Sequence, residues 1–212
     1  MTEGEVKAWL AEHFDVSRET LASLDLFSEL LLDEARRQNL IAHSTIGNFW
    51  DRHIRDSAQL LTLAPAEVRS AAWLDLGSGP GLPGIVLALI GDMKMTLVES
   101  RTRRAAFLAK AVGALGLSDR VSIEAKRIER VATAPFDVIV ARAFAPLPKL
   151  LGLANRFAHA DTWWLLPKGK TVDEELEAIA GSWQGQFKTV KSATSPDASI
   201  LVARGIGPGR RQ

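Results

Sequence analysis

One stretch decides the fold of this chain: Asp75-Leu76-Gly77-Ser78-Gly79-Pro80-Gly81-Leu82-Pro83-Gly84. It follows a short apolar run, Ala72–Leu76, and opens a helical pattern, Gly84–Ile90. Glycine lets the backbone turn sharply and lets a ligand approach without a Cβ in the way. Open α/β sheets bind nucleotide-like ligands at this place, beyond the carboxyl ends of their strands. The stretch therefore predicts a ligand-binding loop. The alternative is a strand-to-helix turn that needs glycine for its geometry alone.

The loop fits two kinds of ligand. The segment 79–84 matches the dinucleotide fingerprint G-x-G-x-x-G. A pyrophosphate needs free backbone N–H groups at the helix N-terminus, and Pro80 and Pro83 have none. S-adenosylmethionine carries no phosphate, and the pattern D-x-G-x-G-x-G is typical of the methyltransferases that bind it. We therefore predict cofactor contacts from Asp75, Gly79 and Gly81, with the Asp75 carboxylate suited to a sulfonium or an ammonium group.

Outward from the loop, short apolar runs alternate with helical patterns, which is typical of a parallel sheet with helices on both faces. The gap between the last two strand candidates is too short for a helical crossover, so they should form an antiparallel hairpin. This layout predicts a Rossmann-like α/β fold, the S-adenosylmethionine-dependent methyltransferase fold with a seven-stranded, mostly parallel sheet. The strand candidates are Ala72–Leu76, Met95–Val98, Val121–Glu124, Phe136–Ala141, Thr162–Leu166, Phe187–Ser192 and Ser199–Ala203. The helix candidates among them are Gly84–Ile90, Thr102–Gly113, a turn near Ile128, Leu147–Phe157 and Val172–Ala180.

Residues 1–68 read as helical and predict an N-terminal helical cap on a catalytic domain of residues 69–206. A short helix over Glu5–Phe14 is followed by a helix behind Ser17. A third amphipathic helix should bury Trp50 and Ile54 and expose Asp51, Arg52, Arg55 and Gln59. Trp163 and Trp164 are neighbours in a strand, so one should face each side of the sheet. The last residues, 207–212, should form a flexible basic tail.

Composition excludes several kinds of chemistry. The chain has no cysteine, so disulfides, thiolate metal sites and cysteine nucleophiles are excluded, and it has no tyrosine. We expect no metal site. The first residues lack the apolar segment of a signal peptide, and no apolar run approaches the ~18 residues of a membrane span. We therefore expect a soluble cytoplasmic protein without a membrane partner. A net charge of +1 neither implies nor excludes nucleic-acid binding.

Two acidic or basic positions extend the predicted site. Glu99 ends the second strand about 20 residues after the loop, where an acidic residue commonly binds ribose hydroxyls; the alternative is a solvated strand end. After the fourth strand the chain reads Ala141-Arg142-Ala143-Phe144 and lacks the Asp/Asn-Pro-Pro-aromatic motif of exocyclic-amine methylases. Without a cysteine, carbon-5 methylation of pyrimidines is also disfavoured. A target such as guanine N7, which has an exposed lone pair, needs orientation and electrostatics but no general base.

Several segments together resemble the bacterial 16S ribosomal RNA guanine-N7 methyltransferase family, also called glucose-inhibited division protein B. They occur in the family's order, and the GPGLPG loop combined with R-A-F after the fourth strand is distinctive. The matching pieces are Asn39-Leu40, Arg52-His53-Ile54-Arg55-Asp56-Ser57, Leu74 through Gly84, Glu99-Ser100, Arg103 with Phe107-Leu108, Arg127-Ile128-Glu129, Arg142-Ala143-Phe144 and Lys168-Gly169.

The resemblance implies a role for each matched position. It implies that Gly77 and Leu82 contact the cofactor. It also implies that Ile128 and Glu129 flank the adenine. Arg142 becomes the binding-site arginine, beside both cofactor and substrate. The resemblance places Arg52, His53 and Asp56 near the catalytic cleft. It further implies direct attack by guanine N7 on the cofactor's methyl group. The expected partner is 16S rRNA, in the small ribosomal subunit or its precursor, and we expect a monomer.

Each of these residues has a plainer alternative. Asp51 with Arg55, and Arg52 with Asp56, have the spacing of surface ion pairs on a helix. His53 alone would more often be a packed histidine. Basic residues at the start of a helix oppose its dipole, so a cluster there favours RNA phosphates, although a mixed solvated surface is the alternative. That cluster is Arg101, Arg103 and Arg104, and Arg36, Arg37, Lys149, Lys168, Lys170, Arg210 and Arg211 are candidates for the same surface.

Three other functions stay open at this point. A small-molecule methyltransferase would have the same fold and would use His43, His53 or His159 as a base. An oxidoreductase would bind NAD in the glycine loop, against the two prolines. A binding module would keep the cofactor without catalysis.

Overall fold

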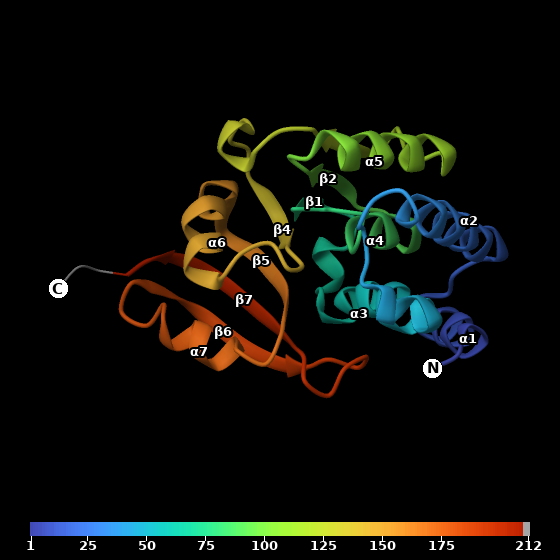
Figure 1. The fold of residues 1–212 in the computed structure, drawn as a ribbon. Helices are drawn as coiled ribbons and strands as arrows, with labels where there is room; N and C mark the ends of the chain where they lie inside the picture. The colour runs from blue at the N-terminus through green and yellow to red at the C-terminus, as the bar shows by residue number, and fades with distance from the viewer. Residues whose placement is uncertain (210–212) are drawn as a thin grey trace.

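The computed structural model describes residues 1–209 and is organised around one central sheet. The strands are β1 (Ala72–Leu76), β2 (Lys94–Val98), β3 (Val121–Glu124), β4 (Phe136–Val140), β5 (Ala158–Lys168), β6 (Trp183–Lys191) and β7 (Ser199–Pro208). They form a seven-stranded sheet in the order β3-β2-β1-β4-β5-β7-β6 (Figure 1). Strands β1 to β5 pair in parallel, whereas β7 runs antiparallel to both β5 and β6. The predicted fold, a mostly parallel sheet closed by an antiparallel hairpin, is confirmed.

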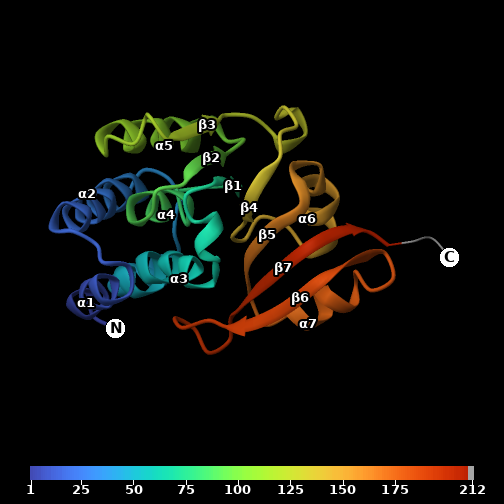
Figure 2. The same cartoon turned by 180° about the vertical axis from the view of Figure 1, so that it is seen from behind.

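Helices cover both faces of the sheet (Figure 2). Alternate residues of each strand point to opposite faces, so Trp73 packs with one group of helices and Leu74 with the other. Trp163 and Trp164 divide between the two faces in the same way, as predicted. On the first face lie α1 (Glu3–Phe14), α2 (Arg18–Ala35), α3 (Asp56–Leu63), α4 (Gly84–Ile90) and α5 (Thr102–Ala114). On the second face lie α6 (Leu147–Ala154) and α7 (Val172–Glu177).

The N-terminal helices share the core of the sheet. Val6 and Leu10 of α1 and Leu24 of α2 are fully buried, in the same apolar cluster as Trp73 and Leu97 of the sheet. Thr2 and Ser17 cap the two helices by accepting hydrogen bonds from backbone N–H groups. The predicted cap at Ser17 is therefore confirmed. Across residues 1–209 no helix is both long and apolar enough to span a bilayer.

The third predicted helix is wrong in its details. The chain instead forms a 3₁₀ turn, η1 (His43–Asn48), then a π-helical turn, η2 (Trp50–Arg55), and only then α3. A π turn is wider than an α turn and shifts the faces of the helix, so Asp51 and Gln59 are buried, not exposed. The Asp51–Arg55 pair does form, at 2.8 Å, but both side chains are largely buried.

The antiparallel strands are longer than predicted. Strand β5 begins at Ala158 and β6 at Trp183, four residues earlier than the sequence indicated in each case. The added residues are mostly exposed, and Trp183 is the one large apolar side chain among them, so they give no apolar run. Strand β7 continues to Pro208, which corrects the prediction that residues 207 and 208 belong to a loose tail. The remaining tail, 210–212, lies outside the described residues.

Candidate active site

The glycine loop is built around a buried carboxyl group. Asp75, in β1, is completely buried, and its Oδ2 accepts a hydrogen bond from the Gly84 N–H at 3.0 Å. Its other oxygen, Oδ1, has no partner. Burial raises the pKa of Asp75 to about 7, although the Gly84 N–H, Ser78 and the Arg142 cation lower it. Both the neutral and the charged form of this carboxyl group are therefore populated at physiological pH.

At two positions of the loop, a side chain larger than that of glycine would collide with neighbouring atoms. Gly77 has φ +68°, and a Cβ there would lie 2.6 Å from Cδ2 of the Phe144 ring. A Cβ on Gly84 would lie 2.6 Å from Oδ2 of Asp75. Both separations are well inside van der Waals contact, so neither position accepts a side chain without movement of the loop.

Glu99 ties the loop to the neighbouring strand. It directly follows β2 and is only 5% exposed. Its Oε2 accepts the Gly79 N–H at 3.0 Å, and its Oε1 accepts the Arg101 N–H at 2.7 Å. Each carboxylate oxygen has a second lone pair, so Glu99 can hold the loop and still accept from a ligand.

A cavity of about 400 Å³, the glycine-loop cavity, opens beside these residues. Four of the predicted cofactor contacts line it: Gly77, Glu99, Ile128 and Glu129. Asp75, Gly79, Gly81 and Leu82 do not line it and lie buried in the loop. Arg142, which was also predicted to contact the cofactor, does not line it either. The four contacts that do line the cavity bring apolar, acidic and backbone groups to it, and basic residues line it as well: Arg101, Arg104, Lys126, Arg127 and Lys149. Together with the unpartnered Asp75 Oδ1, the apolar, acidic and backbone groups fit a ligand that has an adenine, two ribose hydroxyls and positive charges.

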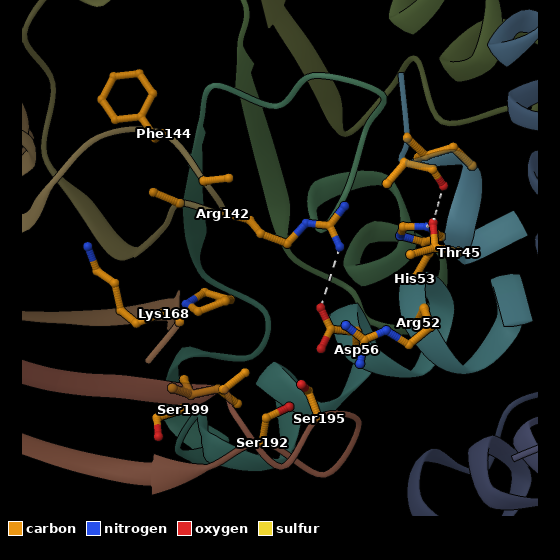
Figure 3. Close-up of a pocket in the computed structure, with 18 of the residues that line it drawn as sticks. Thr45, Arg52, His53, Asp56, Arg142, Phe144, Lys168, Ser192, Ser195 and Ser199 are labelled. Atoms are coloured by element: carbon orange, nitrogen blue, oxygen red, sulfur yellow. Dashed lines mark hydrogen bonds and ion pairs between the residues drawn. The ribbon is translucent and has the colours of Figure 1, made fainter. Parts of the chain in front are cut away.

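A second and larger cavity of about 720 Å³, the substrate cavity, adjoins the first. Arg52, His53, Asp56 and Arg142, the predicted catalytic residues, all line it (Figure 3). The two cavities share the lining residues Ala143, Phe144 and Ala145, which follow β4. The structure thus brings the predicted catalytic residues together but places them in a different hollow from the glycine loop.

The segment after β4 sends two side chains in opposite directions. Ala143 has φ +52°, a left-handed conformation that non-glycine residues rarely adopt. Figure 3 shows Arg142 directed toward the helix that carries Asp56, while Phe144 points away from it. The Arg142 guanidinium lies 3.4 Å from Asp56 Oδ2. Arg142 therefore faces the substrate cavity and Phe144 packs against Gly77.

Asp56 and Arg52 hold the loop between β6 and β7, residues 192–198. Asp56 Oδ1 accepts from the Thr194 hydroxyl and, at 2.9 Å, from the Gln59 amide. Arg52 donates to the Thr194 carbonyl oxygen at 2.6 Å. The alternative interpretation, an ion pair between Arg52 and Asp56, is wrong, because each residue is engaged with this loop. The two side chains thereby fix one wall of the substrate cavity.

His53 is a buried and neutral imidazole. The Thr45 hydroxyl donates to the Ala42 carbonyl oxygen at 2.7 Å, so it must accept from His53 Nε2–H, 2.8 Å away. Nδ1 then keeps a lone pair and has no partner. Burial, and the positive charges of Arg142 and Arg52, lower the pKa of His53 to about 4. At physiological pH the side chain is therefore an acceptor through Nδ1, without a charge.

Sequence reasoning missed several residues of the substrate cavity. Thr45, Ser192, Ser195 and Ser199 line it, and no spacing in the sequence joins them. Lys168 was a candidate for an exposed RNA surface; instead it is 7% exposed and its Nζ lies 2.7 Å from Glu175. No motif in the sequence could have shown these contacts, because they join segments that lie far apart in the chain.

Comparisons with known proteins agree on one family. Residues 20–200 match the model of the GidB family, described as rRNA small subunit methyltransferase G. Ribosomal RNA small subunit methyltransferase G of Rhizorhabdus wittichii is 49% identical over 209 residues, 98% of this chain and 95% of that protein. The protein of the same name from Zymomonas mobilis is 46% identical over 218 residues, 100% of this chain and 98% of that protein.

Solved structures give the same fold at low sequence identity. The O-methyltransferase from Bacillus cereus, in complex with SAH, aligns with a TM-score of 0.61 at 17% identity, over 94% of this chain and 97% of that one. The fold is that of the S-adenosylmethionine-dependent methyltransferases. Because its relatives align over nearly its whole length, the chain belongs to the rRNA small subunit methyltransferase G family and is a methyltransferase.

Proposed function

We propose that this enzyme transfers a methyl group to N7 of a guanine in bacterial 16S rRNA. S-adenosylmethionine supplies the methyl group. The observation that carries the proposal is the junction of the two cavities at 143–145, where a base in the substrate cavity and a cofactor in the glycine-loop cavity would meet. The names of the relatives support rRNA as the substrate.

In this proposal the glycine-loop cavity holds the cofactor. Ile128 and Glu129 flank the adenine, Glu99 accepts from the ribose hydroxyls, and Gly77 faces the methionine end. Asp75, Gly79, Gly81 and Leu82 act from behind, by shaping the loop and by supplying a negative charge beneath it. Residues 1–68 form a helical cap whose η2 and α3 segments close one side of the substrate cavity.

The groups of the substrate cavity favour a nucleophile that needs no base. Three described lining residues carry a carboxylate or an imidazole: His53, Asp56 and Glu175. Asp56 is bound to Thr194, Gln59 and Arg142, and Glu175 accepts from Lys168 and from the Leu147 N–H. His53 has its Nε2–H committed to Thr45 and a pKa of about 4. Guanine N7, with its exposed lone pair, can react without proton removal.

Arg142 supplies a fixed positive charge at the entrance for the base. One of its N–H groups faces Asp56, which leaves others free of protein partners among the described residues. Arginine commonly donates to guanine O6 and N7 together; a contact to O6 alone would leave N7 free to react. Arg142 would thus orient the guanine by holding O6, with Asp56 keeping the guanidinium in place.

Basic residues around the glycine-loop cavity support RNA binding. Arg101, Arg104, Arg127 and Lys149 line its rim, and in the described structure none of the four forms an ion pair. Arg37 and Lys170, by contrast, are paired with acidic residues. We place the RNA phosphates along this rim, while Arg210 and Arg211 lie outside the described residues.

The first experiment uses small-subunit particles from a bacterium that lacks this activity. The enzyme and S-adenosylmethionine are added, the 16S rRNA is digested, and N7-methylguanosine is measured by mass spectrometry. A new signal at one site is expected. An Arg142→Ala enzyme should give a much weaker signal while its circular dichroism stays unchanged. Wild-type enzyme that binds the cofactor but marks no rRNA would contradict the proposal and favour a small-molecule substrate.

A further inference from the structure

We propose that Arg156 is a positioning residue of the cofactor site, which holds the turn that carries Ile128 and Glu129. The inference rests on the proposed location of the adenine at that turn. Arg156 itself lines neither the glycine-loop cavity nor the substrate cavity. Its effect on the cofactor would therefore be indirect, through the backbone of residues 128–133.

The turn is short and has little stability of its own. It is a single 3₁₀ turn, η4 (Ile128–Arg130), between β3 and β4. Its backbone bonds are Arg130 N–H to the Arg127 oxygen at 2.9 Å and Val131 N–H to the Ile128 oxygen at 3.1 Å. Short 3₁₀ turns have poorer hydrogen-bond geometry than α-helices, and the carbonyl groups at a helical C-terminus lack intrahelical partners. Something else must keep this turn in place beside the cavity.

Arg156 adds side-chain contacts at the C-terminal end of this turn. Its guanidinium donates to the carbonyl oxygen of Ile128 and, at 2.9 Å, to that of Val131. A third bond, of 3.2 Å, joins it to the Thr133 hydroxyl. A cation at the C-terminal end of a helical turn is favourable, and the planar arginine fork presents five donors in a fixed geometry, whereas lysine presents a compact charge with three. The side chain of Arg156 therefore holds the turn and the segment that follows it together through hydrogen bonds.

Arg156 is an exposed residue, but its guanidinium also contacts an aromatic ring of the core. It lies 4.4 Å from the centre of the Phe157 ring, in cation–π geometry. Phe157 is fully buried, at the end of the 3₁₀ turn η5 (Asn155–Phe157) that follows α6. Arg156 thus connects the adenine turn to the hydrophobic core on the second face of the sheet. Loss of this connection would free Ile128 and Glu129 to move relative to the glycine loop.

The test measures binding of two adenosine ligands to the purified enzyme by calorimetry. S-adenosylhomocysteine contains both ends of the cofactor, whereas 5′-methylthioadenosine lacks the amino-acid end. The Arg156→Ala enzyme should bind both ligands about tenfold more weakly, because charged hydrogen bonds that order the adenine turn are lost. In methylation assays the KM for S-adenosylmethionine should rise by the same factor, while kcat changes by less than about twofold.

Three further variants separate this role from a general loss of stability. Arg120 makes a similar bond, from its guanidinium to the Gly91 carbonyl oxygen at 2.7 Å, far from both cavities along the sheet. The Arg120→Ala enzyme should therefore bind both ligands as the wild type does. Arg156→Lys keeps the charge, and its affinity for both ligands should fall by less than that of Arg156→Ala. If Arg156→Ala does not fold, this variant tests the inference. Gly77→Asp should abolish binding of S-adenosylhomocysteine.

The possible outcomes are distinguishable. Wild-type affinity for both ligands in Arg156→Ala, or in Arg156→Lys if the alanine enzyme does not fold, would overturn the inference. If Gly77→Asp also binds normally, the proposed cofactor site is itself wrong. Neither result depends on whether rRNA is the substrate, because the binding measurements contain no RNA.

Discussion

At the scale of single residues, Asp75 shows how burial prepares a charge for a ligand. Its carboxyl group has one hydrogen bond from the Gly84 N–H and one oxygen without a partner. Burial raises its pKa to about 7, so the neutral form of Asp75 is populated near neutral pH. A cationic ligand nearby favours the charged form. Cofactor binding should therefore be linked to loss of a proton.

The first prediction is that S-adenosylmethionine binding at pH 7 releases about half a proton per molecule. The cause is a fall in the pKa of Asp75 from about 7 when the cation arrives. Calorimetry in two buffers that differ in ionisation enthalpy measures the number of protons released. The Asp75→Asn enzyme, which has no proton to lose there, is the control. Identical heats in both buffers for the wild type would contradict the prediction.

Gly77 gives a second prediction at this scale. Because a Cβ at this position meets the Phe144 ring, and because φ is +68°, Gly77→Asp should displace the loop as well as crowd it. We expect cofactor binding to be abolished, which calorimetry with S-adenosylhomocysteine would detect. Gly152→Asp is the control, since a Cβ there meets no atom within 4 Å. Unchanged affinity in Gly77→Asp would move the site elsewhere.

His53 gives a third prediction, which concerns stability and pH. Its folded pKa of about 4 lies below the unfolded value of 6.5, so the unfolded chain binds the proton more readily. The contribution of His53 to the stability of the fold is therefore fully present above pH 6.5. It is lost progressively as the pH falls from 6.5 toward 4. Between pH 7.5 and 5 this group should cost roughly 2 kcal/mol of the free energy of unfolding.

Urea unfolding at the two pH values measures this loss. In His53→Gln, whose amide can still donate to Thr45, the decrease between pH 7.5 and pH 5 should be smaller by about that amount. An equal decrease in both proteins would show that His53 does not titrate in this range. Because the pKa of His53 is lowered to about 4, we also expect no inflection from this group in the pH profile of methylation above pH 5.

At the scale of elements, the site depends on segments that pack together across the chain. The loop between β6 and β7 is held on η2 and α3 by Arg52, Asp56 and Gln59, which bind Thr194 and Ala193. These bonds fix the wall of the substrate cavity that carries Ser192 and Ser195. The R-H-x-x-D-S segment therefore holds this loop in place through hydrogen bonds.

The fourth prediction follows from this loop. Thr194→Val removes the hydroxyl that donates to Asp56 and should leave a partly buried carboxylate oxygen with one bond fewer. We expect a loss of about 1–2 kcal/mol in stability and a higher KM for the rRNA substrate, with cofactor affinity unchanged. Thr96→Val is a matched control, since the Thr96 hydroxyl bonds only to the exposed Ser122. Unchanged KM in Thr194→Val would mean that the loop does not shape the substrate cavity.

At the scale of the whole molecule, charge is distributed unevenly although its sum is only +1. The basic rim of the glycine-loop cavity lies at the carboxyl edge of the sheet, beside both cavities. Arg103 and Arg104 are further held by backbone carbonyl oxygens of Arg37 and Asn39, so the helical cap helps to place this charge. The molecule thus presents a local positive surface that net charge does not reveal.

The fifth prediction concerns the salt dependence of RNA binding. Each phosphate contact contributes about 0.7–0.9 to the slope of log affinity against log salt concentration. A triple variant, Arg101→Gln, Arg127→Gln and Lys149→Gln, should therefore lower the slope by about 2 for 16S rRNA or for a small-subunit particle. Lys94→Gln removes a charge at the opposite edge of the sheet and should change it little. An unchanged slope in the triple variant would remove the rim from the RNA interface.

Local pattern was enough for the parallel half of the sheet. Buried parallel strands are continuous apolar runs and their helices have apolar faces, so β1, β3 and β4 began where the sequence indicated. The strands β5, β6 and β7 were predicted too short, because their outer residues give no continuous apolar run. The π turn at 50–55 was missed because one extra residue in a turn leaves no mark on an amphipathic pattern.

What the sequence by itself determined is the glycine loop, the class of fold and the family, because these depend on residues that are neighbours in the chain or in a motif. Only the tertiary structure decided that Arg142 faces Asp56, that Thr194 is bound by Arg52, and that Arg156 holds the turn at Ile128. These contacts join residues between 28 and 142 positions apart. Side-chain hydrogen bonds act over about 3 Å in space and carry no periodic signal along the chain, so only folding reveals them.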